Sequence, residues 1–325
     1  MRLIPLTEYS EETMQLAKPI YDSHRRVLLA ARNKIHSRLQ ERLKQMGIGY
    51  IIVEDAVSEG VSLDEMLDMP TWLDIIQLVK LSYEAAAAKK LLPLRELLQG
   101  VDKLLKEVTG RAVVVSVPAT AVVEDLRLYA HAVNVALVAL QSAKKLGYND
   151  LQMRDIALGC LLHDIGKVLT TDEKLHPEAG FQYLRTIREV NLLSAHIAFQ
   201  HHEKVDGTGY PRAISGTDVH DYAQLCGLAD RYDNLLTIQQ VFPHEAVEAV
   251  MALNGTAYKE SIVQAFIHGV APYPPGTKVM LNNGGQAIVT RIASNKHRPY
   301  VRLLSTGEEL SLADHPTLLV TAVQA

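Results

Sequence analysis

Cysteine is scarce in this 325-residue chain, which has only Cys160 and Cys226. Two thiols are too few to staple a small scaffold with disulfides or to complete a thiolate zinc site. The sequence therefore predicts a fold held by its hydrophobic core, in reducing surroundings. We expect the two cysteines to be core residues.

Long apolar runs are also missing. No stretch approaches the roughly 18–20 uninterrupted apolar residues that are needed to cross a bilayer, and the run 132–140 is short and interrupted by Asn134. The first eight residues lack the apolar segment of a signal peptide. These absences predict a cytoplasmic protein without a membrane span.

Neither sign of charge dominates, since 33 Lys and Arg face 37 Asp and Glu for a formal net charge of −4. Such a balance argues against binding to nucleic acid or to an anionic membrane driven by net charge. The hydrophobic share of 48% and the charged share of 22% are ordinary for globular proteins. The length predicts about two or three domains.

The first 120 residues predict two small units without catalytic spacing. Residues 1–60 are expected to form a small α/β unit, with a helix over 35–46 that ends at Gly47 and a buried strand over 50–53. Residues 61–120 predict a helical connector that Pro93 kinks or divides. The connector either packs onto the next domain, which we favour, or forms the seam of a homodimer.

The remaining chain predicts a helical domain followed by a small β unit. Residues 121–270 carry helical patterns at 121–146, 155–162, 177–188, 191–202 and 219–236, with no strand pattern between them. After Pro275 the pattern changes to period two, with a hairpin signal at Asn283-Gly284. We expect residues 271–325 to form a small SH3-like β-barrel of about five strands.

Histidine is abundant, with 13 in the chain, and several interrupt apolar helices together with aspartates. A buried charge or unpaired imidazole is costly unless it is paired or coordinated. A shared metal site explains these polar residues together, and a His/Asp set suits Fe, Mn, Co or Zn. Two adjacent metals need a bridging carboxylate, which an Asp beside a His at a helix end provides. The residues are His131, His163, Asp164, His176, His201, His202 and Asp230.

Each of these residues also has an ordinary structural interpretation. A single buried histidine is usually a hydrogen-bonded core residue, and we favour that interpretation for His131 or His176 taken alone. The run His163-Asp164-Ile165-Gly166-Lys167 favours a functional turn instead. The run from His201-His202-Glu203 to Gly209-Tyr210-Pro211 favours a functional site still more strongly.

Taken together, these motifs resemble the HD-GYP family of the HD phosphohydrolase superfamily. The resemblance covers about residues 121–268, and its most specific part is the run from His-His-Glu to Gly-Tyr-Pro. It implies hydrolysis of cyclic di-GMP to pGpG, and onward to GMP in some members, by a hydroxide that bridges two metal ions. The overall fold is then mostly α: an HD-type bundle with a small α/β unit before it and a small β-barrel after it.

The resemblance also implies a role for each motif residue. His131, His163, Asp164 and Asp230 would surround one Fe or Mn ion. Asp164 would bridge to a second ion held by His176 with one or both of His201 and His202. Lys167 would orient the scissile phosphate or the bridging hydroxide, and it is a candidate to protonate the leaving oxygen. Gly207, Gly209, Tyr210 and Pro211 would shape the substrate pocket or dock a partner such as a diguanylate cyclase.

Two departures from the family pattern leave an alternative open. Arg127 stands where three-metal members carry a glutamate, so we expect two ions, and Arg127 is a candidate to contact a substrate phosphate. The family's basic run after the last aspartate is absent, since residues 237–242 carry no cation. The alternative is a weakly active or inactive module that binds a cyclic dinucleotide or a partner protein. A different phosphohydrolase, such as a nucleotidase or a cyclic GMP-AMP hydrolase, is a third hypothesis.

Overall fold

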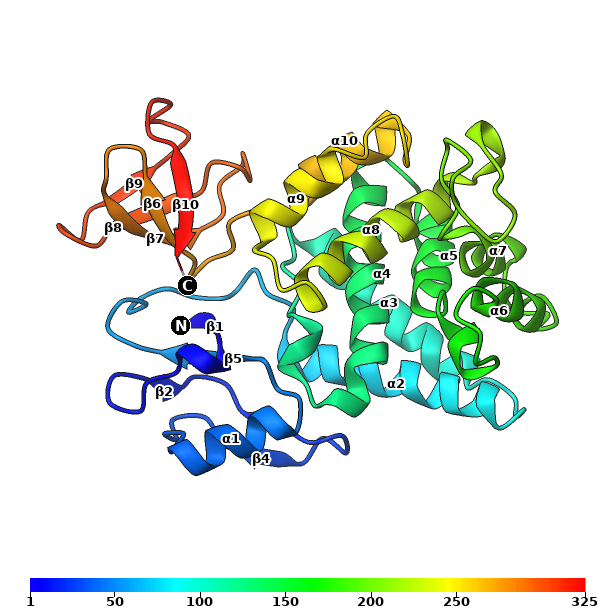
Figure 1. Ribbon diagram of the computed structural model, residues 1–325, viewed down its shortest axis with the longest axis horizontal. Helices are drawn as coiled ribbons and strands as arrows, with labels where there is room; N and C mark the ends of the chain where they lie inside the picture. Colours follow the sequence, from blue (N-terminus) through cyan, green and yellow to red (C-terminus); the bar gives the residue numbers. More distant parts are fainter. Residues whose placement is uncertain (325) are drawn as a thin grey trace.

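The computed structural model describes residues 1–324 and is mostly helical (Figure 1), which confirms the predicted fold class. None of the helices in this range has the length and the apolar character to cross a membrane. The α-helices are α1 (Ser37–Gln45), α2 (Met69–Ala87), α3 (Leu94–Gly110), α4 (Arg127–Lys145), α5 (Asp150–Leu161), α6 (His176–Leu184), α7 (Leu192–Gln200), α8 (Asp221–Thr237), α9 (Pro243–Met251) and α10 (Glu260–Gly269). The strands are β1 (Arg2–Pro5), β2 (Gln15–Leu16), β3 (Ile20–Tyr21), β4 (Val27–Leu29), β5 (Tyr50–Glu54), β6 (Lys278–Leu281), β7 (Gln286–Arg291), β8 (Tyr300–Leu303), β9 (Glu309–Ser311) and β10 (Val320–Gln324).

Helix α4 is the centre of the bundle. Every residue from Ala130 to Ala143 is buried, and α4 packs against α2, α5, α8 and α10. A helix that is apolar on all sides is stable only in the interior of a protein. His131, Asn134 and Gln141 therefore occupy buried positions where each needs a polar partner.

The start of α4 differs from the prediction. The sequence pattern places a helix over 121–146, but the helix begins at Arg127 after two short 3-10 turns, Ala119–Ala121 and Glu124–Leu126. Val122 and Val123 between these turns are extended, and Glu124 donates its amide to the Met46 carbonyl at 3.0 Å. The contact with the N-terminal unit thus delays the helix by about one and a half turns.

The N-terminal unit combines the sheet β1-β5-β2 with helix α1. β1 and β5 are antiparallel, with Leu3 opposite Ile52. The predicted helix 35–46 and strand 50–53 correspond to α1 and β5. The buried residues of this sheet belong to the same continuous hydrophobic core as the helical bundle.

The connector consists of α2 and α3, and Pro93 stands between them as expected for a residue that separates two helices. α2 packs on α4, and α3 packs on α5. Within the chain, the connector therefore packs onto the helical domain.

The C-terminal unit is an open antiparallel sheet with the order β10-β6-β7-β8-β9, so the prediction of a barrel is wrong. Within residues 1–324, β9 and β10 are the two edges and do not pair. Between them, Arg298 donates to the carbonyls of Leu312, His315 and Leu318 at 2.8–3.0 Å. This guanidinium holds the chain after β9 in a loop instead of a continued strand. The sheet has its own small core and lies beside the N-terminal unit (Figure 1).

Candidate metal centre

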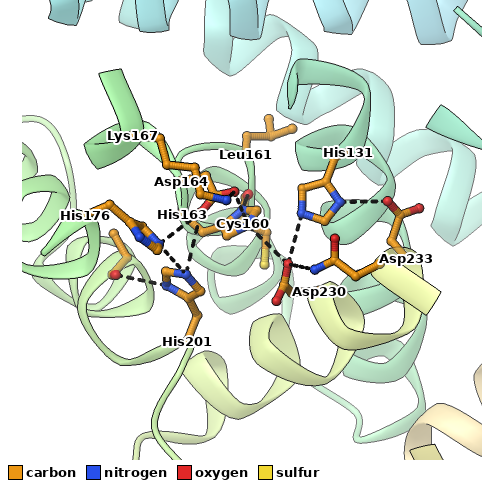
Figure 2. A network of polar contacts seen from close by, with 12 residues as sticks. His131, Cys160, Leu161, His163, Asp164, Lys167, His176, His201, Asp230 and Asp233 are labelled. Atoms are coloured by element: carbon orange, nitrogen blue, oxygen red, sulfur yellow. Dashed lines mark hydrogen bonds and ion pairs between the residues drawn. The ribbon is translucent and has the colours of Figure 1, made fainter. Parts of the chain in front are cut away.

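Five segments of the helical bundle bring the predicted ligands together (Figure 2). They are the first turns of α4, the turn after α5, the start of α6, the end of α7 and the middle of α8. In that order they contribute His131; His163 and Asp164; His176; His201 and His202; and Asp230. All are buried except His202, which is half-buried.

Glycines let two of these segments approach closely. A Cβ atom on Gly166 would collide with the main chain of His176, and one on Gly227 would collide with the main chain of His201. The absence of a side chain at Gly166 therefore allows the turn after Asp164 to lie directly against α6. The same reason allows α8 to lie against the end of α7.

The first group of ligand atoms lies between α4, α5 and α8. His131 Nε2 is 3.0 Å from Asp230 Oδ1, and His163 Nε2 is 3.4 Å from Asp164 Oδ2 and 3.9 Å from Asp230 Oδ1. Ligand atoms of His131, His163 and Asp164 all lie within 4.8 Å of one another. These distances suit coordination of one cation after small side-chain adjustments.

The second group consists of His176, His201 and His202, whose ligand atoms also lie within 4.8 Å of one another. Asp164 Oδ1 is 3.2 Å from His176 Nε2 and 3.7 Å from His201 Nε2. The two oxygens of Asp164 thus face different groups. This is the geometry of a carboxylate that can bridge two cations.

Most of the histidines are anchored through their Nδ1 atoms. His163 donates to the Cys160 carbonyl at 2.8 Å, His201 to the Ala198 carbonyl at 2.9 Å, and His176 to the Glu173 carbonyl. An imidazole that donates from Nδ1 presents the lone pair of Nε2 on its other side. In all three residues that lone pair is directed at the cluster.

The residues fit a bound divalent cation. His163 Nε2 and Asp164 Oδ1 are fully buried without a hydrogen-bond partner among residues 1–324. A buried polar atom left unsatisfied costs about 1–3 kcal/mol. His163 Nε2 belongs to the first group and Asp164 Oδ1 faces the second, so each group holds one buried atom that a cation would satisfy. Imidazole nitrogen and carboxylate oxygen together suit Fe, Mn, Co or Zn.

The protonation states also suit metal binding. Burial lowers the pKa values of His163 and His201, and burial together with the neighbouring His201 lowers the pKa of His202 to about 2. Burial opposes ionisation of Asp164, but His163, His176 and Lys167 outweigh it and hold the pKa of its carboxyl well below the usual value. His163, His201 and His202 therefore offer neutral imidazoles, and Asp164 offers an ionised carboxylate, at neutral pH.

His131 is the exception among the histidines. Its burial disfavours the charged form, but hydrogen bonds to Asp230 and Asp233 outweigh that effect and raise its pKa to about 10. The imidazolium stands where a cation can replace its Nε2 proton. Metal binding at this position must therefore release a proton.

Lys167 lies at the rim of the cluster. Its Nζ atom is 2.6 Å from Asp164 Oδ2, and its side chain is 36% exposed. Burial lowers the pKa of an amine, but the Asp164 charge dominates and raises the pKa of Lys167. The ammonium therefore stays charged at neutral pH, where it can contact an anion that enters from solvent.

The 207–211 loop folds against the second group. The Tyr210 ring stacks on His202 with a centroid distance of 4.5 Å and an interplanar angle of 17°. Glu203 is buried and accepts the amides of Arg212 and Ile214 at 2.8 and 3.2 Å. Gly207 provides a turn at a φ of 80°. Substrate contacts by Gly207, Gly209, Tyr210 and Pro211 stay predictions.

Arg127 lies outside this cluster, which argues against its predicted contact with a substrate phosphate. Its guanidinium donates to the Gly47 carbonyl and lines a cavity between α1 and the start of α4. None of the metal-ligand candidates lines that cavity. The helix places Arg127 and His131 on the same side, but the long Arg127 side chain turns back toward the N-terminal unit.

Sequence reasoning missed two residues behind His131. Asp233 Oδ2 is 2.7 Å from His131 Nδ1, and Asn134 Nδ2 donates to Asp233 Oδ1 at 2.9 Å. The sequence did hint at both residues. Asp233 is three residues after Asp230, and Asn134 is three after His131, so each lies on the same helix face as a predicted ligand. The partners lie on different helices, so the sequence could not pair them.

Comparisons with known proteins place the helical bundle beside proteins of known name. Residues 128–235 match the HD domain family. A cyclic di-GMP phosphodiesterase of Pseudomonas aeruginosa, PA4108, is 29% identical over 186 residues, which are 51% of this chain and 44% of that protein. A cyclic di-GMP phosphodiesterase of Thermotoga maritima is 28% identical over 164 residues, which are 44% of this chain and 45% of that protein.

Among solved structures, the HDG"Y"P protein Bd1817 from Bdellovibrio bacteriovorus is similar in fold, with a TM-score of 0.52 and 18% identity over 81% of this chain and 97% of that one. Residues 128–235 are thus similar to HD domains, which confirms the predicted resemblance to HD-GYP proteins. The chain spans less than half the length of the two curated relatives.

Proposed function

We propose that this chain is a metal-dependent phosphodiesterase that hydrolyses cyclic di-GMP to the linear dinucleotide pGpG. The observation that carries the proposal is the position of Asp164, whose two oxygens face two separate groups of histidine nitrogens. Such a bridging carboxylate suits a pair of ions at the spacing used for phosphoester cleavage. The names of the two curated relatives support the choice of substrate.

In the proposed site, His131, His163, Asp164 and Asp230 hold one divalent ion, and His176, His201 and His202 hold a second with Asp164 between them. Fe and Mn are the ions that we favour. Ions bound there would activate water for attack on phosphorus and offset the charge that develops on the phosphate oxygens.

The chain's own residues then position the substrate. The Lys167 ammonium lies beside Asp164 and is partly exposed, so it can contact a non-bridging phosphate oxygen. Its raised pKa favours this electrostatic role over proton donation to the leaving oxygen. The Tyr210 ring, stacked on His202, leaves an aromatic surface beside the second group for a guanine base.

The test is turnover by the purified full chain. Metal-free protein loaded with Mn²⁺, or with Fe²⁺ without oxygen, is incubated with cyclic di-GMP, cyclic GMP-AMP, pGpG and a nucleoside monophosphate, and the products are separated by chromatography. We expect cyclic di-GMP to be consumed fastest, with pGpG as the first product. Cleavage of added pGpG decides whether GMP is the final product.

Two variants make this test specific. Asp164→Ala should lower turnover to background, whereas Asp102→Ala should retain it, because Asp102 is an exposed carboxylate on α3. A metal-loaded sample that leaves cyclic di-GMP intact would refute the proposal. Equal turnover by Asp164→Ala and the unmodified protein would refute it as well.

A binding module without turnover is the second candidate. The observation in its favour is the segment at the end of α8, where residues 237–242 offer no cation to hold a phosphate. Calorimetry that detects tight binding of cyclic di-GMP, without product in the turnover assay, would favour this candidate. A cyclase partner, a homodimer and a cytoplasmic location stay predictions.

A further inference from the structure

A row of buried polar side chains runs from His131 away from the candidate metal centre. His131 Nδ1 is 2.7 Å from Asp233 Oδ2, Asp233 Oδ1 accepts from Asn134 Nδ2 at 2.9 Å, and Asn134 Oδ1 accepts from Trp72 Nε1 at 3.1 Å. Trp72 and Asn134 are fully buried, and Asp233 is 1% exposed. The row links α4, α8 and α2.

The direction of each hydrogen bond in this row is fixed by Trp72. An indole N–H can only donate, so the carbonyl oxygen of Asn134 must face it. The amide nitrogen of Asn134 must then face the other way, where it meets the Val117 carbonyl at 2.9 Å and Asp233. Asp233 is an acceptor on both sides, so His131 must donate from Nδ1.

This arrangement determines which ring nitrogen of His131 can bind a cation. With the hydrogen held on Nδ1, the Nε2 lone pair of His131 is the one available to a cation, and Nε2 faces Asp230 and the first ligand group. A carboxylate behind an imidazole also makes it a stronger electron donor. Asp233 thus sets both the orientation and the strength of this ligand.

His131 differs here from its neighbours. His163, His176 and His201 donate to carbonyls within the preceding four residues, so their orientation is set locally. His131 lies in the second turn of α4, and its Nδ1 atom is paired instead with Asp233 on α8. Its orientation must come from other elements, and α8 and α2 supply it.

We propose that Asp233 is a positioning residue that holds His131 as a metal ligand, and that Asn134 and Trp72 fix its direction. This inference rests on the metal centre of the proposed function. It adds to that function a buried row of hydrogen bonds that links α2, in the connector, to one ligand of the first ion.

The most informative variant is Asp233→Asn, which keeps the shape of the side chain. Since Asn134 can only donate toward position 233, the new amide must direct its oxygen to Asn134 and its nitrogen to His131. The His131 Nδ1 atom then becomes an acceptor, and its hydrogen moves to Nε2. The lone pair needed for the cation is lost without loss of packing.

Asn134→Leu tests the row one step further back, and Gln141→Leu is its matched control. Gln141 is a buried amide on the same helix, and both side chains tie α4 to the 113–117 segment, Asn134 through the Val117 carbonyl and Gln141 through both main-chain groups of Val114. Only Asn134 also holds Asp233. Both variants should lose stability, but only Asn134→Leu should affect the metal.

The experiment is a calorimetric titration of Mn²⁺ into the metal-free full chain and its variants, with thermal unfolding as the measure of folding. We expect Asp233→Asn to weaken one of the two Mn²⁺ sites by about 10- to 100-fold, the usual effect of losing such a partner. The other site should keep its affinity. Asn134→Leu should weaken the same site to a smaller extent, and Gln141→Leu should leave both sites unchanged.

Trp72 adds a spectroscopic measure, because it is the chain's only tryptophan. Its emission should change when the first site fills, and this change should disappear in Asn134→Leu and persist in Gln141→Leu. A purely structural role for Asn134 would not separate these two variants.

Each other outcome has a definite meaning. Unchanged Mn²⁺ affinity in Asp233→Asn, or equal weakening of both sites, would overturn the positioning role while leaving the proposed function intact. A full chain that binds no Mn²⁺ would overturn both proposals. Normal Mn²⁺ binding with the expected variant effects, but no hydrolysis of cyclic di-GMP, would overturn the proposed function alone.

Discussion

Asp164 illustrates how much of this site depends on single residues. Its carboxylate is almost fully buried, yet it faces three imidazoles and one ammonium ion. Without a cation, burial acts against protonation of His163, His201 and His202. The cluster is therefore a place where protons and metal ions compete, and its charge state must affect the stability of the fold.

This competition predicts a pH dependence for the metal-free protein. The folded-state pKa values of His163, His201 and His202 are lowered, so below about pH 6.5 the unfolded chain binds more protons at these residues and stability falls on acidification. Each group contributes up to about 1.4 kcal/mol per pH unit. The raised pKa of His131, about 10, acts in the opposite direction and lowers stability as the pH rises from about 6.5 to 10.

Urea unfolding between pH 5 and 9, with a chelator present, measures both slopes. We expect a stability maximum near pH 6.5–7, with a steeper loss on the acid side. His202→Ala should make the acid side less steep, whereas His315→Ala should not, because His315 is exposed on the C-terminal unit. A stability that is flat from pH 5 to 7 would contradict the account.

At the residue scale, the sequence predicted which side chains gather but not how they are held. The run 163–167 and the histidine pair at 201–202 stand out because polar residues interrupt apolar helices. The structure brings all the candidates together, although their roles as ligands stay predictions. Arg127 was misjudged because helix periodicity places a Cα atom but not the end of a long side chain.

At the scale of elements, one turn joins the N-terminal unit to the helix that carries His131. Between α1 and β5, Met46 accepts the Glu124 amide at 3.0 Å, Gly47 accepts from the Arg127 guanidinium, and Gly49 donates to the Thr120 carbonyl at 2.7 Å. The helices were predicted by periodicity, but this junction was not. Main-chain contacts between distant segments leave no pattern in side-chain composition.

This junction predicts that two similar glycines differ in their tolerance of a side chain. Gly47 and Gly147 both follow a helix with positive φ, 84° and 76°. A Cβ on Gly47 would lie 2.9 Å from both Arg127 Nη2 and Glu124 Cβ, whereas nothing lies within 4 Å of one on Gly147. Gly147→Ala should therefore cost only the backbone strain of about 1 kcal/mol, and Gly47→Ala should cost about 1–3 kcal/mol more from overpacking.

Urea unfolding of the two variants at one pH checks this difference. Gly47→Ala should also shift the thermal unfolding of the chain further than Gly147→Ala does. Equal losses of stability would contradict this prediction. They would mean that the junction between the N-terminal unit and α4 adjusts to the added methyl group without cost, so its close packing does not constrain α4.

At the scale of the whole molecule, the N-terminal unit and the helical bundle share one hydrophobic core, and the C-terminal sheet has another. The predicted division at residue 60 rests on a change of sequence pattern, and a shared core is invisible to such a pattern. The barrel was overpredicted because strand periodicity says nothing about whether edge strands meet. The division into domains therefore stays a prediction.

The central claim is that Asp164 lies between two metal ions. Crystals of the full chain grown with Mn²⁺ and measured for anomalous scattering test it most directly. The account predicts two peaks about 3.5–4 Å apart, one beside His131, His163 and Asp230 and one beside His176, His201 and His202, with Asp164 contacting both. A single peak, a third peak, or scattering confined to other parts of the chain would contradict it.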